Sequence, residues 1–205
     1  MNEIDMIVPE EIDGLVELFC PKIVSSQRSV FVPVLPESYS LPNHCFPNVE
    51  EKSRKDGGSI EYGWQIWMWP KVFIEAEFHA VWKSPEESLI DITPKVPPYE
   101  KTLFLSDKKK EYRGQQIDNI RKNISNNQLV DLYINVFECI FLIKNAGSRS
   151  TQNEVALSGG ELELFRFLSE AGLTLQNMLK QGISRNDNCF CGSGQNLKTA
   201  VGENC

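Results

Sequence analysis

The sequence is 205 residues long, with 41% hydrophobic residues and a formal net charge of -7 at pH 7. This size and apolar content suit one domain with a small appendage, whereas the acidic balance lacks the electrostatic footprint of proteins that bind nucleic acid or anionic membranes. No run of about eighteen apolar residues occurs, and the acidic N-terminus lacks the basic start and apolar core of a signal peptide. We therefore expect a globular, cytoplasmic protein without membrane insertion.

The first third of the chain predicts helices and strands around one cysteine. Residues 9–19 have one apolar face and acids in the first turn, which predicts a helix, and residues 28–35 alternate as a strand that its internal proline places at a sheet edge. A proline-rich approach leads to Cys45. Residues 48–55 are polar all round, so a helix there is expected to expose most of its surface. Residues 59–69 predict an aromatic-rich strand pair, or one strand interrupted at Gly63, whose tryptophans suit the core or the wall of a cleft.

A histidine and an aspartate come together in the predicted hairpin that follows. Residues 72–82 alternate between apolar and polar positions as in a half-buried strand, with His79 on the polar face and Glu77 beside it. A turn signal separates this strand from residues 89–93, a short apolar run that can pair back on it. The hairpin therefore places Asp91 near His79.

These residues predict a catalytic triad. A carboxylate next to an imidazole fixes its tautomer and stabilises its charged form, so His79 and Asp91 make the orienting half of a triad. Cys45 supplies the nucleophile, because a helix N-terminus and a nearby imidazolium both favour a thiolate. Asn43 or the backbone amide of Cys45 could donate to an oxyanion.

The order Cys, His, Asp, together with the segments HAVW and LIDITP, resembles the transglutaminase-like branch of the papain-like thiol enzymes. The resemblance covers residues 45–93. It implies that Cys45 is the nucleophile, His79 the general base and acid, and Asp91 the orienting carboxylate. It further implies a cysteine-dependent amide hydrolase or acyltransferase, such as a peptidase, amidase, deamidase or transglutaminase. Such an enzyme acts on a protein or peptide through a thioester and requires no cofactor.

Two other interpretations stay open. His44, Glu77, His79 and Asp91 could converge on a hydrolytic metal ion. Alternatively, the protein is a non-enzymatic adaptor, in which Cys45 is a buried small hydrophobe and the three triad side chains do not meet.

The second half of the chain predicts mainly helices. Residues 94–114 are rich in proline and lysine, which predicts a linker and a candidate boundary with one short strand at residues 102–105. Helical periodicity and a capping signal then predict helices over residues 116–122, 127–144 and 158–181. We expect an α+β fold, with an antiparallel sheet and packed helices, in a domain spanning residues 1–182. The resemblance implies that this core is papain-like or transglutaminase-like.

Residues 183–205 contain two closely spaced cysteines in a polar, glycine-containing segment. Its characteristic residues are Arg185, Asn186, Asp187, Cys189, Cys191, Gly192, Ser193, Gly194 and Lys198. These residues resemble the SEC-C motif, a small zinc-binding tail found on the bacterial preprotein translocase motor and on many other bacterial proteins. The family completes its site with an adjacent cysteine–cysteine or cysteine–histidine pair, where this chain has Ala200 and Val201. Structural zinc takes four nitrogen or sulfur ligands, so even with Cys205 one ligand is missing. We expect weak or no zinc binding, a poorly ordered tail that serves as an interaction module, and an origin in bacteria or their phages.

Overall fold

The computed structural model describes residues 6–152, 155–187 and 196–197. The fold class is α+β, as predicted, with helices and an antiparallel, nearly closed sheet. The chain divides into two compact units. The sheet unit comprises Asp5–Pro70 and Ile74–Arg121, and the helical unit comprises Met1–Ile4, Lys71–Phe73 and Lys122–Cys205. The predicted zinc-binding cysteines Cys189, Cys191 and Cys205 lie outside the described residues, so the tail and its boundary near residue 183 stay predictions.

The sheet unit begins with helix α1 (Gly14–Ile23). The side chain of Asp13 accepts hydrogen bonds from the amides of Leu15 and Val16, both at 3.0 Å. These are donors that a helix start leaves without intrahelical partners. The helix therefore begins at this cap, later than the start predicted at residue 9. Cys20 is 3% exposed and belongs to the core.

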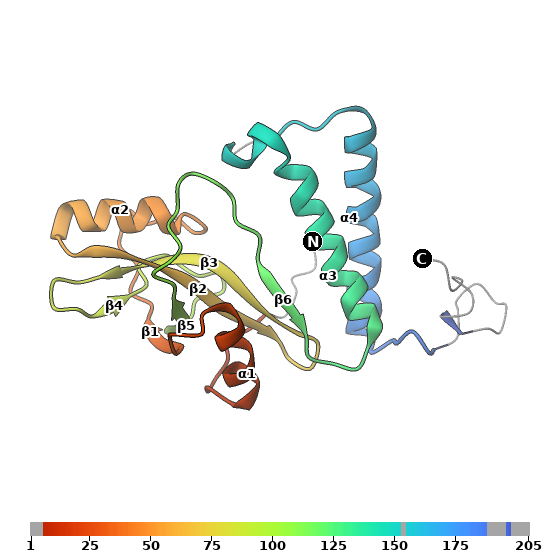
Figure 1. The fold of residues 1–205 in the computed structure, drawn as a ribbon, viewed down its shortest axis with the longest axis horizontal. Coiled ribbons are helices and arrows are strands. Elements are labelled where there is room, and N and C mark those ends of the chain that lie inside the picture. The colour runs from red at the N-terminus through yellow and green to blue at the C-terminus, as the bar shows by residue number, and fades with distance from the viewer. Residues whose placement is uncertain (1–5, 153–154, 188–195, 198–205) are drawn as a thin grey trace. The chain divides into compact units, whose positions relative to one another are not determined.

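Six strands make up the sheet in the part of the chain that the structure describes: β1 (Val30–Pro33), β2 (Ser59–Trp69), β3 (Phe73–Lys83), β4 (Leu89–Ile90), β5 (Lys101–Ser106) and β6 (Ile120–Asn123). Their order is β1-β5-β2-β3-β4, and β6 pairs with β3 (Figure 1). A parallel bridge joins Val34, after β1, to Asp91, after β4. This bridge brings the two ends of the strand order together, so the sheet nearly closes.

Two predictions for the second half of the sheet unit are wrong. The candidate boundary at residues 94–114 contains β5, which pairs with β1 on one side and β2 on the other. Only the short strand expected at residues 102–105 is confirmed. The helix expected over residues 116–122 is absent, and β6 occupies its second half. Pairing with β3 outweighs a short helical pattern, because tertiary context overrides weak local propensity.

Residues 59–69 form one continuous strand, β2, and not a strand pair. A Cβ at Gly63 would lie 2.3 Å from the carbonyl oxygen of Leu105 on β5. Glycine at this position therefore permits the close approach of β2 and β5 without breaking the strand.

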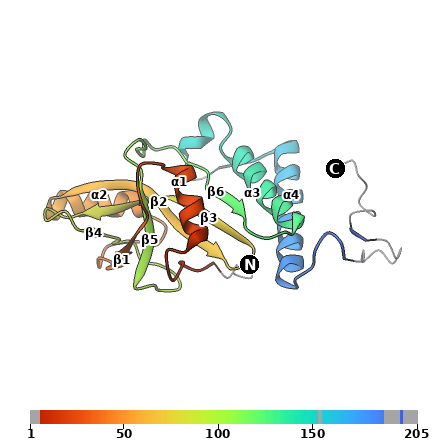
Figure 2. The same cartoon turned by 60° about the horizontal axis from the view of Figure 1, so that its bottom comes forward.

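Helix α2 (Cys45–Asp56) lies along one side of the sheet (Figures 1 and 2). Val49 is fully buried, and Asn48 is only 5% exposed. The predicted exposure of this helix therefore applies to its outer side only. The inner side packs in a buried cluster that comprises Val49, Ala80, Trp82 and Ile92.

The helical unit contains the two long helices predicted there, which are confirmed as α3 (Gln128–Lys144) and α4 (Gly159–Lys180), joined through a short 3-10 helix, η1 (Gly147–Thr151). Asn127 caps α3 and donates to the carbonyl of Ile183, after α4, at 2.8 Å. The predicted capping box does not form, because Ser158 makes no capping hydrogen bond and Glu161 pairs with Arg149 at 2.8 Å. None of the helices in the described ranges has the length and apolar character to cross a membrane.

Candidate functional site

One pocket in the sheet unit contains most of the polar residues singled out in the sequence. Its volume is about 180 Å³, and its wall includes Cys45, Gln65, Trp67, Glu77, His79 and Lys95. Since each water molecule occupies about 30 Å³ in the liquid, the pocket holds a small chemical group and not a folded partner. Asn43, a candidate oxyanion donor, also lines it and has a left-handed backbone with φ 63°.

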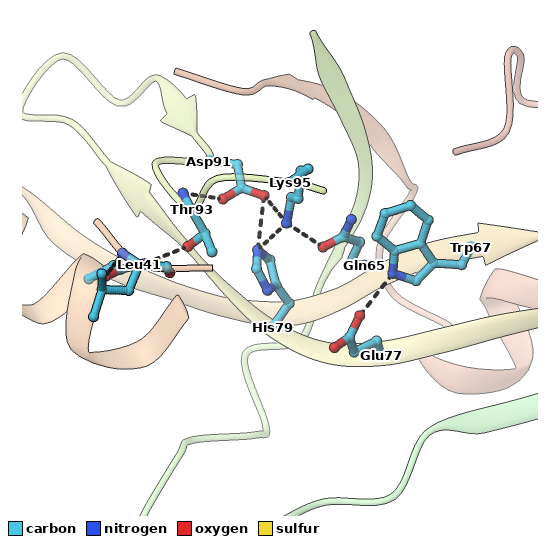
Figure 3. Close-up of polar contacts among 9 residues, drawn as sticks. Leu41, Gln65, Trp67, Glu77, His79, Asp91, Thr93 and Lys95 are labelled. Carbon is cyan, nitrogen blue, oxygen red and sulfur yellow. Dashed lines mark hydrogen bonds and ion pairs between the residues drawn. The ribbon is translucent and has the colours of Figure 1, made fainter. Parts of the chain in front are cut away.

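His79 and Asp91 are in direct contact. The hairpin register pairs Trp82 with Ile90, which places Asp91 just beyond β4 and beside β3. His79 Nε2 lies 2.9 Å from Asp91 Oδ2 (Figure 3). Both side chains are buried, at 4% and 0% exposure. The alternation predicted that the polar face of β3 is exposed to solvent. At His79 this face is instead buried, and the imidazole contacts other polar groups inside the protein.

Lys95 and Gln65 complete this buried polar cluster, and the sequence interpretation missed both. Lys95 Nζ lies 2.8 Å from Asp91 Oδ2 and 3.4 Å from His79 Nε2, and it donates to Gln65 Oε1 at 2.7 Å (Figure 3). Two signals were available. Lys95 follows Asp91 by four residues and carries the opposite charge, and Gln65 is the single amide in an aromatic-rich strand.

The electrostatics of the cluster favour an ion pair. Burial is the largest influence on His79 and favours the neutral ring, yet the Asp91 carboxylate outweighs it and raises the pKa of His79 to about 9. Burial also opposes ionisation of Asp91, but His79 and Lys95 hold the pKa of Asp91 well below its usual range. An imidazolium and a carboxylate therefore face each other at neutral pH.

Cys45 is the first residue of α2 and lines the same pocket as His79. The first amides of a helix and its dipole favour an anion at this position. Cys45 is 8% exposed, and its proximity is one of the smaller causes of the raised pKa of the His79 imidazole. No hydrogen bond joins Cys45 to His79 within the described ranges, so the structure brings the two into one pocket without direct bonding.

Asn48 ties the cysteine-bearing helix to the segment that carries Asp91. Its side-chain oxygen accepts a hydrogen bond from the amide of Leu41 at 3.1 Å. Its side-chain nitrogen donates to the carbonyl of Leu41 at 2.8 Å and to Thr93 Oγ1 at 3.3 Å. The amide of Thr93 in turn donates to Asp91 Oδ1 at 2.9 Å. This chain of bonds fixes Asp91 and the start of α2 relative to each other, which is how a supporting network orients reactive groups.

The metal interpretation gains no support from this geometry. Among the described residues, no group of three or more histidine, cysteine, aspartate and glutamate side chains is arranged to hold a metal ion. The Lys95 ammonium also lies within 3.4 Å of the potential ligand atoms of His79 and Asp91. A bound cation at those atoms would be repelled by it.

No protein-family model, curated protein or solved structure matches the chain. The resemblances to the papain-like thiol enzymes and to the SEC-C tail therefore stay expectations from the sequence. The function of the chain is therefore inferred from the chemistry of the pocket.

Proposed function

We propose that the protein is a cysteine-dependent enzyme of acyl transfer, an amide hydrolase or acyltransferase acting on a protein or peptide. The observation that carries this proposal is that Cys45, at a helix N-terminus, shares a small pocket with an imidazole held 2.9 Å from a buried carboxylate. A nucleophile, a base and an orienting acid are the parts that nucleophilic acyl transfer needs.

In this proposal each ring nitrogen of His79 has its own role. Nε2 is engaged by Asp91 and approached by Lys95, while the other ring nitrogen, Nδ1, points away from both (Figure 3). Nδ1 is therefore the atom that exchanges protons with Cys45 and with the substrate. The Asp91 carboxylate stabilises the imidazolium whenever Nδ1 carries a proton.

The reaction proceeds in two steps. The Cys45 thiolate attacks the carbonyl carbon, the carbon–nitrogen bond breaks, and the departing amine takes the proton from Nδ1 of His79, which leaves a thioester and a neutral imidazole. Water or a second amine then gives its proton to Nδ1 and attacks the thioester carbon. The product leaves, and the thiolate and the imidazolium are restored.

The adaptor interpretation expects an inert Cys45 and triad side chains that do not meet. Cys45 is indeed buried, but His79 and Asp91 are in contact, and Lys95, whose side chain is 8% exposed, adds a second cation to their carboxylate. Buried charged groups are expensive unless they are paired, and they cluster at functional sites more often than in ordinary cores. This concentration of charge favours the interpretation as an enzyme over the interpretation as an adaptor.

The test is to trap the acyl-enzyme. The protein is mixed with p-nitrophenyl acetate, nitrophenolate release is followed, and the acetylated residue is located by mass spectrometry. We expect a burst with the acetyl group on Cys45, no burst in Cys45→Ala, and acetylation slowed by at least about 100-fold in His79→Gln. Cys139→Ala is the matched control, because Cys139 is an exposed thiol outside the sheet unit. Equal acetylation of Cys45 and Cys139 would favour the adaptor.

A further inference from the structure

Glu77 is a charged group of the pocket that the reaction above does not use. Its carboxylate accepts a hydrogen bond from Trp67 Nε1 at 2.8 Å (Figure 3), a neutral donor that leaves the negative charge in place. Within the described residues, Glu77 forms no ion pair. The neighbouring acid of the strand, Glu75, differs because Arg121 lies 2.6 Å from it.

The other charges of the site balance without Glu77. The negative charge of Asp91 faces two cations, Lys95 and the imidazolium of His79. In the thiolate form that the proposed function requires, Cys45 brings the sum of these four charges to zero. In that form Glu77 gives the pocket one excess negative charge, which a cationic group of the substrate would neutralise.

Glu77 is also held in a fixed place close to the reacting atoms. Trp67, its donor, packs edge-on against Tyr99 with ring centroids 5.7 Å apart, and the Tyr99 hydroxyl donates to the carbonyl of Met6 at 3.1 Å. Glu77 precedes His79 by two positions on β3, so their side chains lie on the same side of the strand with Cα atoms about 7 Å apart.

From this placement we infer that the pocket selects substrates with a positively charged amine or guanidinium group near the reacting carbonyl, and that Glu77 binds this group. The inference rests on the proposed function. Because Glu77, Cys45 and His79 line one pocket, a cation at Glu77 corresponds to a lysine or arginine side chain on the residue that carries the carbonyl, or to a free amino terminus about one residue away. The indole of Trp67 beside the carboxylate adds an aromatic surface that attracts cations.

The experiment uses two methanethiosulfonate reagents of similar size, one with a trimethylammonium group and one with a sulfonate. In both, the thiolate attacks the sulfenyl sulfur, a disulfide forms and methanesulfinate leaves, so the rate ratio reports the charge preference at Cys45. We expect the cationic reagent to react faster, and the ratio to fall at least about fivefold in Glu77→Gln and to reverse in Glu77→Lys. Glu86→Gln, in the exposed turn after β3, makes the same change in net charge and should leave the ratio unchanged.

The outcomes separate the two proposals. If Cys45 reacts with neither reagent, both the proposed enzymatic function and the inferred substrate preference are wrong. If Cys45 reacts readily but Glu77→Gln and Glu86→Gln give the same rate ratio, the inferred preference for cations is wrong and the proposed enzymatic function is unaffected.

Ester substrates then distinguish the two sources of positive charge. An N-acetyl-lysine ester tests a cationic side chain, and a glycylglycine ester tests a free amino terminus. Preference for neither over an N-acetyl-norleucine ester also contradicts the inference.

Discussion

Around His79 and Asp91, neighbouring positions of the β3–β4 hairpin are equally buried but have opposite chemistry. Ala80 and Ile92 are 0% and 1% exposed and pack against α2 in an apolar cluster. His79 and Asp91, the residues immediately before them, are 4% and 0% exposed and pair with each other. Successive residues of a strand point to opposite faces, so a shift of one position separates a hydrophobic core from a buried charge cluster.

This contrast shows that burial alone does not identify a core residue. On the packing face, stability comes from apolar area removed from water. On the polar face, each buried charge needs its partner, because an isolated one is strongly destabilising. Such an arrangement is retained where charges serve chemistry, and the predictions below test whether the two faces differ in this way.

The largest effect is expected for Asp91→Ala. This change leaves the His79 imidazolium and the Lys95 ammonium, 3.4 Å apart, without their carboxylate. Removing one partner of a buried charged group destabilises a protein by about 3–5 kcal/mol. Urea unfolding measures the loss. Asp91→Asn preserves the shape and one hydrogen-bond acceptor, so it serves as the variant that folds. A loss below about 1 kcal/mol for both variants would contradict a charge-dependent cluster.

The pH dependence of stability comes next. The pKa of His79 is about 9 in the folded protein against an unfolded value near 6.5. Its contribution to stability is therefore fully present below about pH 6.5 and is lost as the pH rises through about 9, a change on the order of 3 kcal/mol. The pKa of Asp91 is lowered from 3.8, so its contribution holds above that pH and is lost as the pH falls further. Urea unfolding from pH 6 to 10 should show the alkaline loss, and His79→Gln should reduce it. Equal slopes in both proteins would argue against the raised pKa.

A smaller effect, confined to stability, is expected on the packing face. Ile92→Val removes one methylene group from the cluster with Val49 and should cost about 0.5–1.5 kcal/mol. Because this change does not touch the polar face, the alkylation rate of Cys45 in the folded variant should match that of the unchanged protein. A rate that falls along with stability would show that the two faces are not independent.

The smallest effect on stability is expected for Lys95→Met, since methionine keeps the buried stem and Asp91 keeps His79 as its partner. The pKa of His79 should rise, because a cation 3.4 Å from Nε2 is removed. NMR titration of the imidazole protons measures this directly, and the chain has only one other histidine to assign. A lowered pKa would mean that Lys95 acts mainly by positioning Asp91.

The sequence could predict the local features of this site. Period-two alternation identified β3, the turn signal identified its hairpin with β4, and the hairpin placed Asp91 beside His79. The long helices α3 and α4 followed from their apolar periodicity. Each of these features depends on residues close together in the chain, where pattern and structure coincide.

The rest depends on contacts between distant segments. Lys95 follows a proline in a stretch with the composition of a linker, and it acquires its role only because Asp91 and Gln65 meet there. The partners of β5, β1 and β2, lie 30 or more residues away in the sequence, so nothing local marks it as an inner strand. The misassigned helix at residues 116–122 has the same cause, since a free edge of β3 recruits β6.

Iodoacetamide labelling as a function of pH tests whether Cys45 and His79 act as a pair. Cys20 is the internal reference for a buried inert thiol, because burial raises its pKa. We predict that Cys45 is labelled fastest, that most of its rate remains near pH 6.5, and that His79→Ala shifts the labelling to alkaline pH. Labelling of Cys45 as slow as that of Cys20, or a pH profile unchanged by His79→Ala, would contradict the account.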